Sequence, residues 1–305
     1  MNIAIFGIGG VGGYYGGLLA RRYEGGETHW VSFVARGEHL RMIREKGLKV
    51  ITQEGEFVAR PAVATDRPEK IGPLDLVLVT VKGYDLDSAA RALAGVTGKD
   101  TVVIPLQNGV DNAERLRAHL PGGRVMNGTV YISSRIVEPG VVQQLGGACS
   151  LFFGPEEGDV APYREIESLL RDAGIKATLS GEISKEVWKK FLFISPVAGA
   201  TALFDKPLGG VLEDGEASRL LEGMMTEVDR VARAKGIDLP RDAVLQAMET
   251  VARFPYETKT SFQVDVEKGR RTEIETLIGY VIRAGESLGI ETPFNLRTYQ
   301  ALSKK

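Results

Sequence analysis

Residues 2–12, which read NIAIFGIGGVG, decide the fold of the first half of this chain. Five residues typical of a buried strand run directly into a glycine-rich loop, and an amphipathic segment follows to about residue 22. The spacing G-x-G-x-x-G allows a tight turn, close approach of the backbone to a pyrophosphate and close packing of a helix on a strand. Amides at the start of that helix would face the phosphates. We therefore predict a dinucleotide-binding loop made of Gly7, Ile8, Gly9, Gly10, Val11 and Gly12.

The rest of the first half alternates short apolar runs with amphipathic stretches, a pattern typical of βα units in a parallel sheet. Further strands are predicted at residues 31–35, 74–81, 101–106, 124–136, 141–153 and 175–179, with an inserted hairpin at 48–63. A helix is expected near residues 162–172. These elements indicate a Rossmann domain, with a doubly wound and mostly parallel sheet.

Helical periodicity replaces this alternation after about residue 180. Helices are predicted at residues 183–204, around residues 220–231 and from about Glu273, where Thr272 and Glu275 have the spacing of a capping box. We therefore divide this α/β chain into an N-terminal Rossmann domain at residues 1–180 and an all-helical C-terminal domain at residues 181–305.

Composition excludes several classes of function. The 38 basic and 40 acidic side chains nearly cancel, so binding of nucleic acid is not expected. The single cysteine, Cys149, forms neither an intramolecular disulfide nor a soft metal site, so no metal is expected. An apolar strand from residue 2 leaves no room for a signal peptide, and no apolar run approaches the roughly 20 residues of a membrane span. We expect a cytoplasmic protein that does not bind a membrane.

The end of the second predicted strand bears on the choice of cofactor. NAD-binding domains usually place a carboxylate there to bind the ribose hydroxyls. Here the strand ends at Arg36, and no acidic residue occurs before Glu38. A guanidinium suits a 2′-phosphate, so the sequence favours NADP(H).

Two polar side chains follow other predicted parallel strands, at the sheet edge where such folds bind ligands. Lys82 could contact cofactor phosphate or ribose, and Asn108 could contact the nicotinamide or the substrate. The Asn-Gly pair at residues 108–109 is equally consistent with an ordinary turn.

Reduction of a carbonyl needs a proton donor, and the helical domain contains no histidine. A lysine, a tyrosine or a carboxylic acid would then serve, and Lys190 is one candidate on the predicted helix 183–204, where apolar residues flank it at helical spacing. Such a lysine either extends its ammonium to solvent or is desolvated with a lowered pKa. Glu273 and Ser261 are further candidates, but a helix-start carboxylate and a helix cap are equally consistent with their positions.

The chain resembles the ketopantoate reductases (2-dehydropantoate 2-reductases) over essentially its whole length. The resemblance rests on the N-terminal glycine motif, Arg36 and four further segments: Val-Lys-x-x-Asp at 81–85, Gln-Asn-Gly at 107–109, Trp-Lys-Lys at 188–190, and residues 261–274 with their serine-to-glutamate spacing.

The resemblance implies roles for individual residues of this chain. Lys190 would be the general acid that protonates the ketone oxygen as NADPH delivers hydride, and Glu273 would work with Lys190 and with the cofactor. Asn108 would lie between cofactor and substrate, and Ser261 would hydrogen-bond the substrate. Lys82, Arg36 and Ser134 would contact the cofactor. The expected partners are a small 2-oxo acid and a second copy of the chain in a homodimer.

The substrate-binding part departs from the family pattern. Where ketopantoate-specific enzymes have asparagines, this chain has Ile194, Ala198 and Leu208. The default reaction is reduction of 2-dehydropantoate to pantoate in pantothenate biosynthesis. The alternatives are a reductase of a more apolar 2-oxo acid or of a 3-oxo acid, a dehydrogenase for an opine-like imino product, and a non-catalytic NADP(H)-binding regulator.

Overall fold

The computed structural model describes residues 1–304 and contains two compact units. Unit 1 comprises Met1–Gln107 and Asp111–Ile183, and unit 2 comprises Asn108–Val110 and Ser184–Lys305. The division near residue 183 lies three residues after the boundary expected from the sequence. The assignment of Asn108–Val110 to unit 2 was not expected, and it reflects packing, because Val110 lies against the core of the helical unit.

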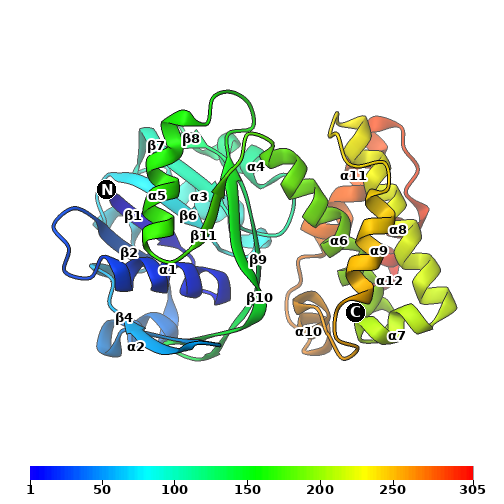
Figure 1. The fold of residues 1–305 in the computed structure, drawn as a ribbon, viewed down its shortest axis with the longest axis horizontal. Helices are drawn as coiled ribbons and strands as arrows, with labels where there is room; N and C mark the ends of the chain where they lie inside the picture. Colours follow the sequence, from blue (N-terminus) through cyan, green and yellow to red (C-terminus); the bar gives the residue numbers. More distant parts are fainter. Residues whose placement is uncertain (305) are drawn as a thin grey trace. The chain divides into compact units, whose positions relative to one another are not determined.

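Unit 1 is built on a six-stranded sheet in which all neighbouring strands are parallel (Figure 1). Its strands, in spatial order, are β5 (Val63–Thr65), β2 (Trp30–Val34), β1 (Asn2–Phe6), β6 (Leu74–Val79), β7 (Thr97–Pro105) and β8 (Arg124–Val125). Counted along the chain this order is 3-2-1-4-5-6, the doubly wound order of a dinucleotide-binding domain. The associated helices are α1 (Gly10–Arg22), α2 (Gly37–Lys46), α3 (Leu86–Leu93) and α4 (Asn112–His119), with short 3-10 turns η1 (Pro68–Lys70) and η2 (Gly83–Asp85). The predicted Rossmann fold is confirmed.

A second, mixed sheet in unit 1 contains β3 (Leu48–Thr52), β4 (Gly55–Ala59), β9 (Asn127–Glu138), β10 (Val141–Gly154) and β11 (Lys176–Leu179). The turn η3 (Ala161–Tyr163) and helix α5 (Arg164–Asp172) connect its last two strands. Helix α1 contacts strands of both sheets (Figure 1). Its glycines allow this, because a Cβ on Gly13 would lie 2.5 Å from Val142 and one on Gly17 would lie 2.6 Å from Val50.

Unit 2 is all-helical, as predicted. Its helices are α6 (Ile183–Phe204), α7 (Leu208–Glu213), α8 (Gly215–Ala234), α9 (Ala243–Ala252), α10 (Ser261–Glu267), a π-helical turn η4 (Glu275–Gly279), α11 (Tyr280–Leu288) and α12 (Pro293–Leu302). The core includes Leu220, Met224, Val228 and Val231 on one face of α8, which is the periodicity seen in the sequence. Glu227 on the same helix is buried and accepts hydrogen bonds from the backbone amides of Phe294 and Asn295 at the start of α12.

Helix α6 corrects the expectation that no segment has the length and apolar character of a membrane span. Its 22 residues pass that test by length and composition, although 67% of the relevant window is buried within the protein. A single buried helix of this kind is a poor indication of a membrane protein. Pro196 lies inside α6, and the helix continues through this residue.

The start of the helical segment near Glu273 differs from the sequence-based expectation. No side chain caps the π-helical turn, so the expected capping box between Thr272 and Glu275 is not formed. The carbonyl of Glu273 accepts the first hydrogen bond, from the amide of Leu277, so the helix begins next to the predicted position. A π-turn was not expected, and such turns frequently occur at functional sites.

Candidate active site

The glycine loop of unit 1 has a tight turn and a closely packed helix, two of the features that its glycines were expected to allow. Gly7 has a φ of 104°, and a Cβ there would lie 2.8 Å from Val81. A Cβ on Gly12 would lie 2.1 Å from the carbonyl oxygen of Gly7, so only glycine lets α1 pack this closely on the turn. A Cβ on Gly9, in contrast, would have no atom within 4 Å. The loop therefore has open space beside Gly9, at the start of α1, where a pyrophosphate would fit.

Ser134 on β9 lies against this loop. A Cβ on Gly10 would be 2.3 Å from the carbonyl oxygen of Ser134, so the two backbones are in close contact. The Ser134 hydroxyl is buried and has no hydrogen-bond partner among residues 1–304. An unsatisfied buried hydroxyl beside a glycine loop is a group that a bound ligand could satisfy.

Arg36 follows β2, at the carboxyl edge of the parallel sheet, as the sequence predicts. Its guanidinium is 81% exposed and forms an ion pair of 2.5 Å with the carboxylate of Asp85. The sequence did not suggest this acidic neighbour, because Asp85 is 49 residues away on the turn after β6. An exposed ion pair contributes only about 0–1 kcal/mol, so it would not prevent the guanidinium from binding a phosphate.

Two further polar residues lie near the same edge of the sheet. Lys82 directly precedes the turn η2 and is half-buried. Gln107 follows β7 and is 6% exposed, and neither polar atom of its amide has a hydrogen-bond partner among the described residues. In the sequence, the only signal for Gln107 is its place in the Gln-Asn-Gly turn.

Unit 2 brings three of the predicted site residues together. The ammonium of Lys190 on α6 donates a hydrogen bond of 2.9 Å to Oδ1 of Asn108. Lys190 is half-buried as a residue, but protein atoms surround its ammonium, and this burial lowers the pKa of Lys190 to about 8. The nearby carboxylate of Glu273 acts in the opposite direction and raises the pKa. Of the two interpretations of Lys190 from the sequence, the structure favours the desolvated lysine.

The neighbours of Lys190 on α6 differ in exposure. Lys189 is exposed, with Glu186 3.9 Å away, as expected of a surface charge. Ile194, one helical turn after Lys190, is half-buried. Ala198 and Leu208 are 1% and 2% exposed and belong to the core of unit 2. Of the three positions that depart from the family pattern, only Ile194 is therefore partly accessible beside the lysine.

Ser261 is exposed as the first residue of α10, and it does not cap that helix. Thr260 is the cap, since its hydroxyl accepts a hydrogen bond of 3.0 Å from the amide of Gln263. Glu273 is 7% exposed just before the π-helical turn. The structure thus places the predicted cofactor-loop residues, Arg36, Lys82 and Ser134 in unit 1, and it places Asn108, Lys190, Ser261 and Glu273 in unit 2.

Both halves of the chain match profiles of known protein families. The profile described as ketopantoate reductase PanE/ApbA matches residues 3–158, and the one described as ketopantoate reductase PanE/ApbA C terminal matches residues 182–305. The chain is also 35% identical over 294 residues to a 2-dehydropantoate 2-reductase of Halobacterium salinarum, a match that covers 96% of this chain and 95% of that protein.

Solved structures show the same similarity over the whole chain. A 2-dehydropantoate 2-reductase from Porphyromonas gingivalis is 37% identical, with a TM-score of 0.85 and coverage of 99% of both chains. A PanE/ApbA family ketopantoate reductase from Ralstonia eutropha is 30% identical, with a TM-score of 0.90 and coverage of 100% of this chain and 98% of that one. The similarity therefore extends over both units.

Proposed function

This chain belongs to the ketopantoate reductase family, a family of oxidoreductases, and we propose that it reduces a 2-oxo acid to a 2-hydroxy acid with NADPH. The default substrate is 2-dehydropantoate, the substrate named for several relatives. Its reduction would yield pantoate for pantothenate biosynthesis. The hydrogen bond between Lys190 and Asn108 carries this proposal, because it holds a lysine with a pKa of about 8 in a defined position.

The chain's own residues would hold the cofactor as follows. The open space beside Gly9 would accommodate the pyrophosphate at the start of α1, and Ser134, whose backbone lies against that loop, would offer its buried hydroxyl. Arg36 at the end of β2 would bind the 2′-phosphate, and Lys82 would contribute positive charge near the same edge. When bound, NADPH supplies the hydride for the carbonyl carbon.

Lys190 would supply the proton. As the carbonyl carbon is reduced, its oxygen gains negative charge, and the Lys190 ammonium transfers one proton to it and becomes a neutral amine. A general acid works best when its pKa is near the working pH, and burial brings Lys190 into that range. The Asn108 amide orients the ammonium, and the Glu273 carboxylate favours its charged form.

A more apolar 2-oxo acid is the second candidate substrate, and Ile194 is the observation that favours it. A side chain one turn after the acid on α6 lies on the same face as Lys190, and here it is an apolar, half-buried group. A site built to hydrogen-bond a substrate hydroxyl discriminates strongly in favour of it, whereas an apolar site does not.

The test is oxidation of NADPH, followed at 340 nm, with 2-dehydropantoate beside 2-oxo acids with branched apolar side chains and a set of 3-oxo acids. The default substrate is supported if kcat/KM for 2-dehydropantoate exceeds the others by at least about tenfold. If the enzyme instead prefers the apolar acids, and if Ile194→Asn reverses this preference, the result would support the more apolar 2-oxo acid as the substrate. Tight binding of NADPH without turnover on any carbonyl would instead indicate a regulator.

Arg36→Ala tests the choice of cofactor. Loss of a charge-assisted hydrogen bond costs about 1.5–3 kcal/mol, so KM for NADPH should rise by about 10- to 100-fold while KM for NADH stays nearly constant. Arg41→Ala is the matched control, because Arg41 lies on α2 and its guanidinium forms ion pairs with the exposed Glu38 and Glu45. Equal losses for both cofactors would contradict an NADP preference carried by Arg36.

The pH dependence of reduction follows from the lowered pKa of Lys190. Only the protonated lysine can act as the acid, so kcat/KM for the 2-oxo acid should be flat below about pH 8 and decrease as the pH rises through 8. Glu273→Gln removes the charge that raises this pKa, so it should move the decrease to lower pH. An unchanged profile in the Gln variant would show that Lys190 does not set the pH dependence.

We also infer a cytoplasmic homodimer. A ketopantoate reductase from Staphylococcus aureus is described as dimeric, and it has the same fold. The mass of the purified protein in solution, measured by light scattering, would test the association. A mass equal to that of one chain would contradict the homodimer.

A further inference from the structure

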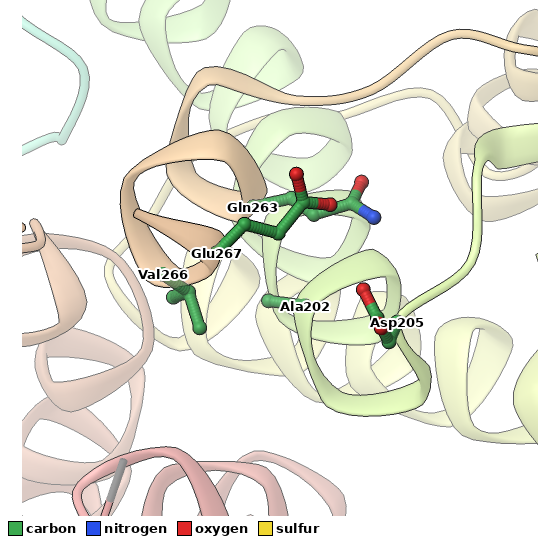
Figure 2. A pocket seen from close by; sticks show the side chains of 5 residues that line it. All are labelled: Ala202, Asp205, Gln263, Val266 and Glu267. Atoms are coloured by element: carbon green, nitrogen blue, oxygen red, sulfur yellow. The ribbon is translucent and has the colours of Figure 1, made fainter. Parts of the chain in front are cut away.

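A cavity of about 200 Å³ in unit 2 lies between the end of α6 and helix α10. Its lining residues are Ala202, Asp205, Gln263, Val266 and Glu267. Figure 2 shows the amide of Gln263 and the carboxylates of Asp205 and Glu267 at this cavity, with Val266 and Ala202 as its apolar part. Its volume is much larger than one water molecule requires, so it can accept a small organic molecule.

Gln263 is the residue that distinguishes this cavity from an ordinary packing gap. It is 1% exposed, and both polar atoms of its side-chain amide are buried without a hydrogen-bond partner among residues 1–304. Its backbone amide is held by the cap residue Thr260. Buried amides are almost always hydrogen-bonded, and an unsatisfied one lowers stability. A ligand with a donor and an acceptor would satisfy both amide atoms.

The cavity also carries negative charge. Glu267 accepts a hydrogen bond of 2.8 Å from the ammonium of Lys259, so the charge of this carboxylate is largely compensated. Asp205 is exposed, and the described chain contains no basic group within ion-pair distance of its carboxylate. The pKa of Lys259 is raised chiefly by its hydrogen bond to Glu267, and the charge of Asp205 adds to this effect. The backbone of Asp205 has a φ of 52°, a conformation that aspartate and asparagine tolerate better than most residues. One carboxylate is therefore available to a cation.

We propose that this cavity binds a small primary ammonium compound that also carries a neutral amide or a similar hydrogen-bonding group. The ammonium would donate to Asp205 and Glu267, and the neutral group would pair with the Gln263 amide. An organic ammonium fits better than a bare metal ion, because residues 1–304 contain no group of three or more His, Cys, Asp or Glu side chains that could hold one. Val266 and Ala202 would contact a small apolar part of the ligand.

Along α6 this cavity lies far from Lys190, whereas on α10 its lining residue Gln263 is two residues from Ser261. Ala202 follows Lys190 by twelve residues on α6, which corresponds to about 18 Å along a helix. The proposed ligand differs in charge from a 2-oxo acid, so binding measured without cofactor or oxo acid tests the proposal apart from the reductase reaction.

Isothermal titration of the full-length protein with L-alaninamide is the direct test. Lactamide, which has a hydroxyl in place of the ammonium, tests the charge, and 2-aminopropane, which lacks the amide, tests the Gln263 contact. We expect millimolar binding of L-alaninamide and no measurable binding of lactamide. We expect binding of 2-aminopropane to be at least about fivefold weaker.

Three variants locate the binding. Asp205→Asn keeps a residue that tolerates the backbone conformation and should weaken binding of L-alaninamide by about tenfold or more. Gln263→Leu should also weaken it, and it should raise the melting temperature because the unsatisfied amide is removed. Asp172→Asn changes the same charge at the end of α5 in unit 1 and should leave binding unchanged.

The contrary results are equally defined. Absence of L-alaninamide binding at 50 mM would overturn the proposal, as would equal binding by all three variants, which would show a non-specific effect of cations. Binding of Mg²⁺ that requires Asp205 and Gln263, without binding of L-alaninamide, would replace the organic ammonium with a hydrated metal ion and would also overturn it.

Discussion

Replacement of Lys190 by alanine is expected to lower kcat for 2-oxo acid reduction by about 10²- to 10⁴-fold, the usual contribution of a positioned general acid. The Lys190 ammonium is the group held by Asn108, and the burial that lowers its pKa makes it a better acid than a surface lysine. NADPH binding, measured by quenching of protein fluorescence, should change by less than about threefold, because the predicted cofactor-binding groups lie mainly in unit 1.

Lys189→Ala is the matched control for this experiment. It removes the same charge from the adjacent position of α6, but Lys189 is exposed and only 3.9 Å from Glu186, so kcat should stay within about twofold of the wild-type value. Equal losses in both variants would show that the net charge of the helix matters and that Lys190 is not the acid. Near-wild-type activity of the Lys190 variant would exclude it directly.

Substitutions in the glycine loop should separate the cofactor site from the fold. Gly9→Ala adds a Cβ where no atom lies within 4 Å, and Gly9 has an extended backbone that alanine can adopt. This variant should therefore unfold at nearly the wild-type temperature, while the new methyl group occupies space that the pyrophosphate needs. We expect Kd for NADPH to rise by at least about tenfold, a loss of about 1.4 kcal/mol.

Gly12→Ala is the contrasting variant. Its Cβ would lie 2.1 Å from the carbonyl oxygen of Gly7, so α1 must move away from the turn. Such overpacking costs about 1–3 kcal/mol, which should appear as a lower melting temperature together with weaker NADPH binding. Normal NADPH affinity in the Gly9 variant would mean that the pyrophosphate does not approach that residue.

Local pattern was sufficient for the first strand, loop and helix of unit 1. Residues 2–22 contain the strand, the loop and the helix in one continuous segment, so their geometry follows from neighbouring residues. The same is true of the apolar stripe of α8, where the helical repeat alone identifies the buried face.

Contacts between distant residues could not be obtained in this way. In the second sheet Lys49 of β3 pairs with Val141 of β10, more than ninety residues away in the sequence. The periodicity of short segments does not predict such a pairing. The ion pair between Arg36 and Asp85 is another example, because the chain near Arg36 contains no sign of that carboxylate.

The sequence by itself determined the fold class, and it singled out residues 7–12 and Lys190 as candidate site residues, because residue type and short spacing are local features. Only the tertiary structure decided that Lys190 is desolvated and bonded to Asn108, since burial depends on which distant segments surround the ammonium. It also decided that Asn108–Val110 pack with the helical unit, that Glu273 acts on the same lysine, and that Gln263 is buried unsatisfied beside a cavity. The pKa of a side chain and the satisfaction of a buried amide depend on surroundings in three dimensions, which short-range spacing does not encode.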